Sequence, residues 1–219
     1  MRIDLHTHTL LSDGELLPIE LARRALAKGH KGIAFTDHVS LSTIERVIKE
    51  ASKDCELATE WDMDAILGVE ITHVPVSKID MVVAEARRLG AELIVVHGET
   101  ISEPVEKGTN RAAVNNPDVD VLAHPGFITL EEVQAAKDNG IVLEITSRAA
   151  HSATNGHVAR LAREAGARMV VNSDTHAPKD LLSEDEAILR ALAAGLSKAE
   201  AERAVRKTPI EVMRRIRKK

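Results

Sequence analysis

The start of the chain places two histidines, His6 and His8, two residues apart, and an aspartate, Asp13, follows in a Ser-Asp-Gly turn. The apolar residues Ile3 and Leu5 precede and separate them, which indicates a strand, and on a strand side chains two residues apart leave the same face. Imidazole and carboxylate groups together suit zinc, manganese or iron. A short His-x-His motif alone is equally typical of polar surface residues, so the choice between a metal site and a polar surface depends on the rest of the sequence.

Side chains able to bind metal recur where later apolar runs end. They are His38 after F-T-D, Glu70 after L-G-V, His97 after I-V-V, His124 after V-L-A, and Asp174 and His176 in S-D-T-H. The carboxyl ends of parallel strands meet on one face of a barrel, where such enzymes build active sites. Six of the seven strands predicted below carry such a residue, which favours a metal centre over chance. With His6, His8 and Asp13 there are nine candidate ligands, more than one four-coordinate ion needs, so we expect two or three ions with Glu70 as a bridge.

Short apolar runs alternate with amphipathic patterns along the whole chain, which is typical of βα units around a parallel sheet. The sequence predicts strands over 2–6, 32–37, 65–71, 93–97, 121–124, 142–145 and 169–173. It predicts helices over 16–28, 42–53, 77–89, 130–139 and 156–165, a short helix near Asn110, and C-terminal helices over 183–194, 198–207 and 209–217. Seven such units predict an α/β fold, a closed or nearly closed barrel one unit short of the eight-fold form. A doubly wound open sheet is the alternative, but no G-x-G-x-x-G or G-x-x-x-x-G-K-[ST] motif supports a nucleotide-binding fold.

The composition limits both the size and the partners of the protein. Its 219 residues, 44% of them hydrophobic, suit a single domain over 1–219, in which the helices from about residue 183 pack on the barrel. A net charge of −5, with one Trp, two Phe and no Tyr, argues against nucleic acid as a substrate.

The single cysteine, Cys55, indicates a reducing compartment. Because the sequence has neither a signal-peptide pattern nor an apolar run near the roughly 18 residues of a membrane span, we expect a cytoplasmic protein with no membrane partner. Its oligomeric state stays open.

Several stretches are similar to motifs of the PHP (polymerase and histidinol phosphatase) family of metal-dependent phosphoesterases. They are D-L-H-T-H with S-D-G, F-T-D-H, G-V-E, V-H-G-E, A-H-P-G, L-E-I-T and N-S-D-T-H, and they occur in the family's order over almost the whole chain. The resemblance implies a distorted (β/α)7 TIM-like barrel with a trinuclear centre of zinc, manganese or iron. It implies one ion held by His6, His8, Glu70 and Asp174, a second by Glu70, His97 and His124, and a third by Asp13, His38 and His176.

The expected reaction is hydrolysis of a small phosphomonoester, similar to histidinol phosphate, by a hydroxide that bridges two metal ions. Glu70, Asp174 and His176 are the expected catalytic residues because they would position these ions. Some PHP members have a histidine where this chain has Asp13, and the difference is expected to affect which metal fills that position.

Cations and further histidines near the strand ends are candidates for substrate binding. Arg148 is the first choice because a guanidinium can bind two phosphate oxygens, although a solvated loop arginine explains it almost as well. Lys107 and Arg111 flank a Gly-Thr-Asn turn whose backbone N–H groups could receive an anion, and capping by Thr109 is the alternative. One of His151, His157 and His73 is expected to protonate the leaving group or to shape the pocket, although a local hydrogen-bonding role explains any one of them better.

Two residues outside this set also carry expectations. Glu144 ends a predicted strand and is expected to hydrogen-bond a ligand histidine, which would fix the orientation of its ring. His30 lies in a turn at the opposite face of the predicted barrel, so we expect it at the surface.

Two alternative functions remain. The same metals could act on phosphodiesters, as in the exonuclease domains related to this family in DNA polymerases, but the negative charge and the scarcity of aromatic residues argue against that. The chain could instead be a non-catalytic structural or RNA-binding subunit, which would have no need for nine costly polar groups in one cavity.

Overall fold

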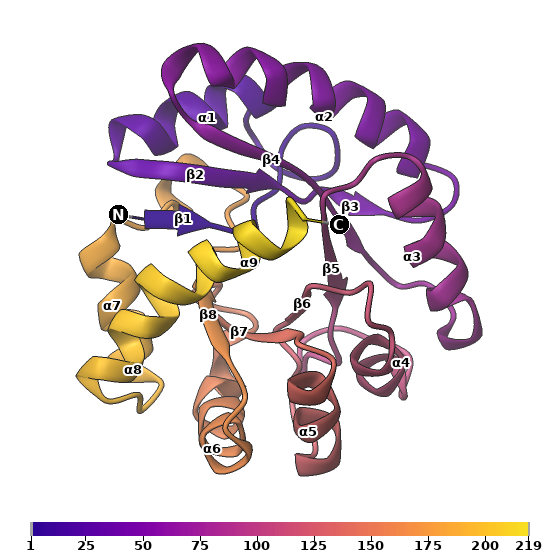
Figure 1. The fold of residues 1–219 in the computed structure, drawn as a ribbon, viewed down its shortest axis with the longest axis vertical. Coiled ribbons are helices and arrows are strands. Elements are labelled where there is room, and N and C mark those ends of the chain that lie inside the picture. Colours follow the sequence, from indigo (N-terminus) through magenta and orange to yellow (C-terminus); the bar gives the residue numbers. More distant parts are fainter. Residues whose placement is uncertain (1, 219) are drawn as a thin grey trace.

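Seven parallel strands form the centre of the molecule (Figure 1). The computed structural model of the protein describes residues 2–218. Each strand pairs with the next in the order β1, β2, β4, β5, β6, β7, β8. Their bounds are β1 (Arg2–Asp4), β2 (His30–Phe35), β4 (Asp64–Ile71), β5 (Leu93–His97), β6 (Val121–Ala123), β7 (Val142–Thr146) and β8 (Met169–Asn172). Every predicted strand is present, because a strand buried on both faces reads as an apolar run.

The outer strands β1 and β8 approach each other and close the sheet almost completely. Thr7 and Thr175 form a bridge just beyond the two strands. The N–H of His8 donates to the carbonyl of Thr175 (2.8 Å), and the N–H of Asp174 donates to the carbonyl of His6 (3.0 Å). The fold is therefore a nearly closed (β/α)7 barrel of the TIM-like type, as the sequence predicts.

One strand escapes prediction from the sequence. β3 (His38–Val39) follows β2 after a short break and pairs in parallel with the last part of β4, where His38 lies beside Glu70. A strand of two residues shows no periodicity, so only its pairing reveals it.

Helices surround the sheet on its outer side (Figure 1). They are α1 (Pro18–Ala27), α2 (Ile44–Ala58), α3 (Ile79–Arg88), α4 (Thr109–Asn115), α5 (Leu130–Asp138), α6 (Asn155–Ala165), α7 (Glu184–Ala193), α8 (Lys198–Glu202) and α9 (Thr208–Ile216), with a π-helical turn, η5 (Arg203–Lys207), between the last two. Short 3-10 turns add η1 (Thr59–Trp61), η2 (Val76–Lys78), η3 (Ser152–Thr154) and η4 (Pro178–Asp180). Capping boxes at Thr129, Ser183 and Ser197 satisfy backbone groups at the starts of α5, α7 and α8.

The apolar residues form two separate cores. The larger one lies between the sheet and the outer helices, and it includes Leu21 of α1, Val47 of α2 and Val82 of α3. The smaller one fills the inside of the barrel, with Ile3, Ile66 and other residues near the strand starts. Together they bury the faces of every strand, which gives the barrel a rigid frame for residues at its rim.

Helix α9 covers the amino-terminal end of the barrel. Its residues Val212, Met213 and Ile216 belong to the inner core with the strand starts, and in Figure 1 the helix crosses in front of the sheet. Arg215 of α9 also donates to Asp120, just before β6, at 3.0 Å. The carboxyl ends of the strands are therefore the open end of the barrel.

Burial corrects one expectation. His30 is completely buried rather than at the surface, and its Nε2 lies 2.7 Å from the carbonyl oxygen of Leu182 in a hydrogen bond. The segment before α7 covers it, a contact between residues 152 positions apart that local sequence does not reveal. Within residues 2–218, none of the helices combines the length and the hydropathy that a bilayer crossing requires.

Candidate metal centre

All nine candidate ligands lie together at the open end of the barrel. Glu70 lies within β4, His38 begins β3 and His97 ends β5, whereas the other six follow the ends of β1, β6 and β8. Six are buried and three are at least partly exposed, the exposed ones being Asp13, His38 and His176. Overlapping groups of these residues place one ligand atom each within 4.8 Å of one another.

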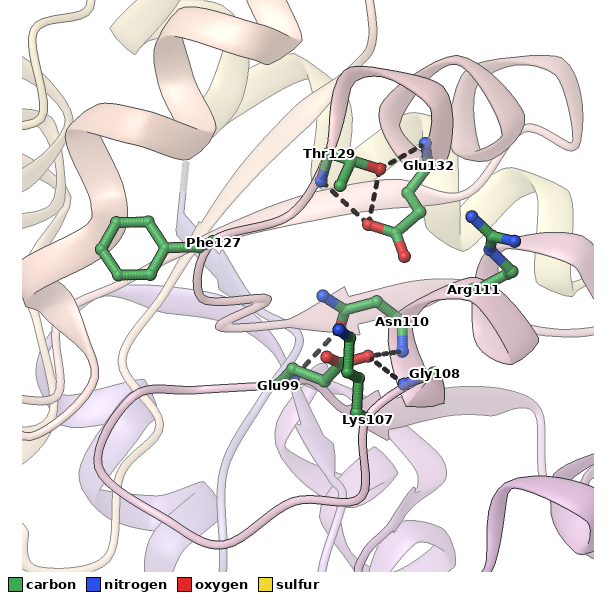
Figure 2. A pocket seen from close by; sticks show the side chains of 8 residues that line it. All are labelled: Glu99, Lys107, Gly108, Asn110, Arg111, Phe127, Thr129 and Glu132. Atoms are coloured by element: carbon green, nitrogen blue, oxygen red, sulfur yellow. Dashed lines mark hydrogen bonds between the residues drawn. The ribbon is translucent and has the colours of Figure 1, made fainter.

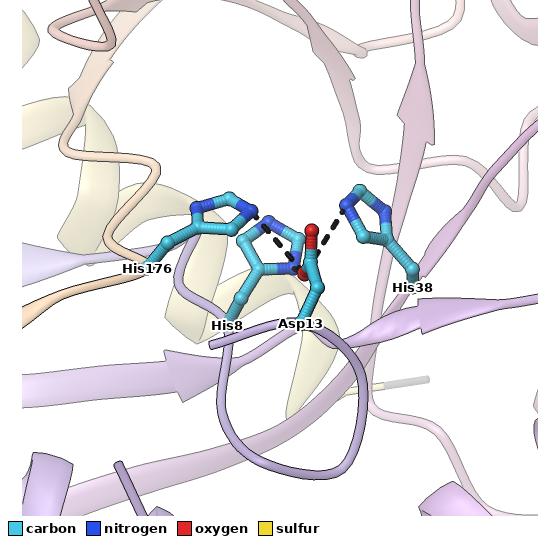
Figure 3. A group of neighbouring side chains, drawn as sticks. All are labelled: His8, Asp13, His38 and His176. Atoms are coloured by element: carbon cyan, nitrogen blue, oxygen red, sulfur yellow. Dashed lines mark ion pairs between the residues drawn. The ribbon is translucent and has the colours of Figure 1, made fainter. Parts of the chain in front are cut away.

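One such group consists of His8, Asp13, His38 and His176 (Figure 3). Asp13 Oδ1 lies 3.3 Å from His176 Nε2 and 3.6 Å from His38 Nε2. Figure 3 shows the carboxylate between the rings of His38 and His176, with His8 behind it. These four side chains, from three separate loops, form a compact set of nitrogen and oxygen donors.

The loop that carries Asp13 is held against the barrel by a residue that sequence analysis overlooked. Asp37, in the F-T-D-H motif, accepts hydrogen bonds from the N–H of Thr9 (2.7 Å) and the hydroxyl of Ser12 (2.6 Å). Gly14 lets this loop pass close to the backbone, because a Cβ there would lie 2.5 Å from the carbonyl oxygen of His8. The position of Asp13 is therefore fixed by its neighbours.

Glu70 lies at the centre of the arrangement. Its Oε1 is 3.3 Å from His6 Nε2 and 3.5 Å from His124 Nε2, while its Oε2 is 2.7 Å from His38 Nδ1. Neither oxygen accepts a hydrogen bond from a described residue, although both are completely buried. Burial raises the pKa of Glu70, but the nearby histidines outweigh it and hold the pKa well below its ordinary value. A buried carboxylate in this state needs positive charge beside it.

Several candidate ligand histidines are oriented by a hydrogen bond at the other ring nitrogen. Nδ1 of His6 bonds with Glu144 Oε1 at 2.8 Å, and Nδ1 of His97 and of His176 bonds with the carbonyl oxygens of Gly98 (3.1 Å) and Asp174 (3.0 Å). Each bond places the proton on Nδ1 and leaves the Nε2 lone pair free. Such oxygen partners are typical of histidines that bind metal.

Glu144 has the role expected from the sequence. Besides His6, it accepts the N–H of His124 at 3.0 Å and the side-chain amide of Asn172 at 2.8 Å. One buried carboxylate therefore positions two ligand histidines from different strands.

Two of the candidate ligands adopt strained backbone conformations. His124 has φ 26° and Asp174 has φ 53°, values that residues with a Cβ rarely adopt. Strain of this kind persists where the surrounding structure enforces it, and it concentrates at functional sites. Both residues turn sharply out of a strand end, which directs their side chains toward Glu70 and His6.

His151 and Glu103 join the centre, and the sequence analysis gave no role to Glu103. His97, His124 and His151 form one group of neighbouring nitrogen atoms, and His73, His97 and Glu103 form another. His151 stacks on His124 at 4.3 Å between ring centroids, and its Nδ1 lies 2.7 Å from the hydroxyl of Thr100. Glu103 lies on a loop without periodicity, so no pattern in the sequence signals it.

The donor set fits divalent metal ions. Neutral imidazoles and carboxylates converge here, and burial lowers the pKa of His8 and of His97 to about 4, so both are neutral at neutral pH. Burial also lowers the pKa of His38, but Glu70 more than reverses this and raises it to about 9. The cluster thus favours added positive charge, which divalent ions supply.

Of the four candidate substrate-binding residues, Arg148 and His151 lie at this centre. Both line a cavity of about 40 Å³ together with six of the nine candidate ligands and Glu103. Arg148 Nε lies 3.9 Å from Asp174 Oδ2. The guanidinium therefore stands at the edge of the cavity, partly exposed to solvent.

Lys107 and Arg111 line a different pocket (Figure 2). The backbone N–H groups of Gly108 and Asn110, where we expected an anion, both donate to Glu99 Oε1 at 2.9 Å. Thr109 makes no capping bond, and its hydroxyl donates instead to the carbonyl oxygen of Glu106 at 2.7 Å, so the capping interpretation of this turn is wrong. The α4 start receives an anion, but it is a carboxylate of the same chain.

Comparison with known proteins identifies the family. A model of the PHP domain matches residues 4–197. The chain belongs to the PHP family. An uncharacterized protein of Methanocaldococcus jannaschii is 48% identical to this PHP protein, over 99% of this chain and all of the relative. A probable phosphatase of Caldanaerobacter subterraneus subsp. tengcongensis is 31% identical, covering 85% of this chain and 80% of its own length.

Other relatives are named as ribonuclease P subunits and not as phosphatases. Ribonuclease P protein component 3 of Methanosarcina mazei is 29% identical, covering 94% of this chain and 86% of its own. Among solved structures, archaeal ribonuclease P with mature tRNA contains a chain that matches with a TM-score of 0.68 at 16% identity, over 97% of this chain and 89% of that one. At this identity the match supports the PHP barrel fold alone.

Proposed function

We propose that this PHP protein is a metal-dependent phosphoesterase that hydrolyses a small phosphomonoester. One observation carries the proposal: Glu70 is completely buried among ligand histidines, and neither of its oxygens accepts a hydrogen bond from a described residue. In a core with a purely structural role, a buried carboxylate has a hydrogen-bonded partner of opposite charge, or an apolar residue occupies its position. The probable phosphatase of Caldanaerobacter adds support from sequence.

The proposed ligands divide into three sets, and Glu70 belongs to two of them. His6, His8, Glu70 and Asp174 would hold one ion; Glu70, His97 and His124, with His151 beside them, a second; and Asp13, His38 and His176 a third. Ions bound there supply two things, an activated water at neutral pH and positive charge for the phosphoryl oxygens.

The protein's own groups orient the substrate. Arg148 stands at the cavity edge, where its guanidinium can bind phosphoryl oxygens in pairs and neutralise charge that develops on them. His151 lies across the cavity with Nδ1 near the hydroxyls of Thr100 (2.7 Å) and Ser102 (2.8 Å), so its Nε2 faces the cavity. We propose that His151 Nε2 either protonates the leaving oxygen or binds the second ion.

A second candidate function is an RNA-binding role without catalysis, which the Methanosarcina relative favours. Against it stand the net charge of −5 and the presence of all nine ligands in one centre. A polyanion is bound mainly by cationic surface, and this chain has more acids than bases.

The test is a panel of substrates after reconstitution with zinc, manganese or iron. We expect turnover of phosphomonoesters, incorporation of one labelled oxygen from water into the released phosphate, and a roughly thousand-fold loss of kcat/KM in the Glu70→Gln variant. Binding of transfer RNA without hydrolysis of any phosphoester would overturn the proposal in favour of the second candidate.

A further inference from the structure

A second pocket opens directly from the metal centre, on the side of β7, β8 and α7. Its volume is about 570 Å³, and Arg148, Asp174 and His176 line both this pocket and the small central cavity. A substrate whose phosphate lies at the centre has this pocket as an adjacent space for the remainder of the molecule.

Two cations line the outer part of the pocket. Lys179 lies on η4 and Arg190 on α7, and both are exposed. Within residues 2–218 neither side chain has a hydrogen-bond or ion-pair partner, whereas Arg163, for example, binds Glu200 at 2.8 Å. Their charges are therefore available to a ligand.

The acids of the pocket do not cancel these cations. Asp174 is a candidate metal ligand, and Asp180 Oδ2 accepts the N–H groups of His176 (3.2 Å) and Ala177 (2.8 Å). Glu15 is the remaining acid that lines the pocket. Three cations, including Arg148, thus face one uncommitted carboxylate.

The backbone that carries both cations is fixed. The bonds to Asp180 hold η4, and a capping box between Ser183 and Glu186 defines the start of α7. The hydroxyl of Ser147 donates to the carbonyl of Ser173 at 3.0 Å and ties the two loops beside Arg148. Such preorganisation lowers the entropic cost of binding.

The pocket beyond His73 on the other flank of the centre has a different character. It measures about 410 Å³ and is lined mainly by apolar residues such as Leu41, Pro75 and Met81, with Lys78 as its one cation. An anionic group attached to a phosphoester would therefore favour the side of Lys179 and Arg190.

We propose that Lys179 and Arg190 form a second anion subsite, which selects small phosphomonoesters that carry a further anionic group, a carboxylate or a second phosphate. The inference rests on the proposed function, because the metal ions and Arg148 hold the first phosphate. It narrows the substrate class from any phosphomonoester to one with two separated anionic groups.

Non-hydrolysable phosphonates test this inference without turnover. Butylphosphonate, ω-phosphonobutyrate and butane bisphosphonate would be titrated calorimetrically into the manganese-loaded protein. The test variant is Lys179→Met with Arg190→Met. The control is Lys198→Met with Arg214→Met, which removes the same charge from exposed positions outside the pocket. Native and control proteins should bind at least one doubly anionic compound about ten-fold more tightly than butylphosphonate.

In the test variant this advantage should disappear while butylphosphonate binds as before. The better of the two doubly anionic compounds identifies carboxylate or phosphate as the second group. Equal binding of all three compounds by the native protein overturns the subsite and leaves the proposed function intact. An advantage that survives in the test variant also overturns it, and failure of every phosphonate to bind contradicts the proposed function itself. Preferential binding of a phosphorylated oligonucleotide would replace the small-molecule class.

Discussion

At the amino end of the barrel buried carboxylates accept hydrogen bonds from arginines, whereas at the carboxyl end the buried carboxylate of Glu70 is surrounded by histidines, the nearest at 2.7 Å. Arg2 donates to Asp4 at 2.8 Å, and Asp120 accepts Arg87 at 2.5 Å and Arg215 at 3.0 Å. At the other end Glu70 is just as buried, yet no described residue donates a hydrogen bond to it.

The two ends differ in whether their buried charges are compensated by groups of the same chain or by a bound ligand. Paired charges compensate each other's desolvation, so the charges at the amino end are balanced within the chain, although the Nε atoms of Arg2, Arg87 and Arg215 have no hydrogen-bond partner among the described residues. The carboxyl end collects carboxylates and imidazoles whose oxygen and nitrogen atoms converge, and the buried oxygens of Glu70 have no hydrogen-bond donor among the described residues. One scaffold thus uses buried charge for stability at one end and for ligand binding at the other.

The largest effect is expected from Glu70→Gln, which keeps the shape of the side chain and removes its charge. Metal content should fall, and kcat/KM should fall by roughly three orders of magnitude, or about 4 kcal/mol of transition-state stabilisation. Elemental analysis and phosphatase assays measure both. The exposed variant Glu164→Gln is the control, and a fully active, metal-loaded Glu70→Gln protein would contradict the comparison.

Asp120→Asn should produce the opposite pattern. Two arginines would lose their buried partner, so the free energy of unfolding should fall by about 3 kcal/mol. Urea denaturation of the metal-free protein measures this, and metal content per folded molecule should stay unchanged. A loss of metal with unchanged stability would show that the two ends do not divide their roles as we infer.

Glu144→Gln removes the charged partner of His6 while it keeps an amide of similar shape. Weaker orientation of His6 and His124 should lower metal affinity by about ten- to a hundred-fold. Competition with a chelator at graded concentrations gives the affinity, and circular dichroism checks the fold. Unchanged affinity would mean that packing alone orients these rings.

Sequence predicted the frame, and which candidate ligands lie together at one end of it, for a physical reason. Strands buried on both faces read as apolar runs, and the carboxyl ends of parallel strands must meet, so Glu70 and His97 could be placed before the fold was known. β3 was too short to show a pattern, and the burial of His30 depends on a segment far along the chain.

Loop residues were the least predictable part of the site. Glu103 and Asp37 gain their roles from loop conformations, and His151 approaches His124 only in the folded chain. Lys107 and Arg111 were expected at the site but line another pocket. A cation that is near a strand end in the sequence therefore need not lie near the site in the fold. Local sequence patterns indicate which residues are buried, whereas the direction in which a loop side chain points depends on tertiary structure.

The smallest effect is expected from Thr72→Val. The hydroxyl of Thr72 donates to the carbonyl of Glu70 at 3.1 Å and so accepts the Nδ1 proton of His38 at 2.7 Å, a nitrogen that also lies 2.7 Å from Glu70 Oε2. This anchor is neutral and partly exposed, unlike Glu144, so its loss should cost about 1 kcal/mol, or about five-fold in affinity for the ion near Asp13. Manganese titration of activity measures it, with Ser42→Ala as the control. An effect as large as that of Glu144→Gln would mean that charge and burial of the anchoring group matter less than the hydrogen bond itself.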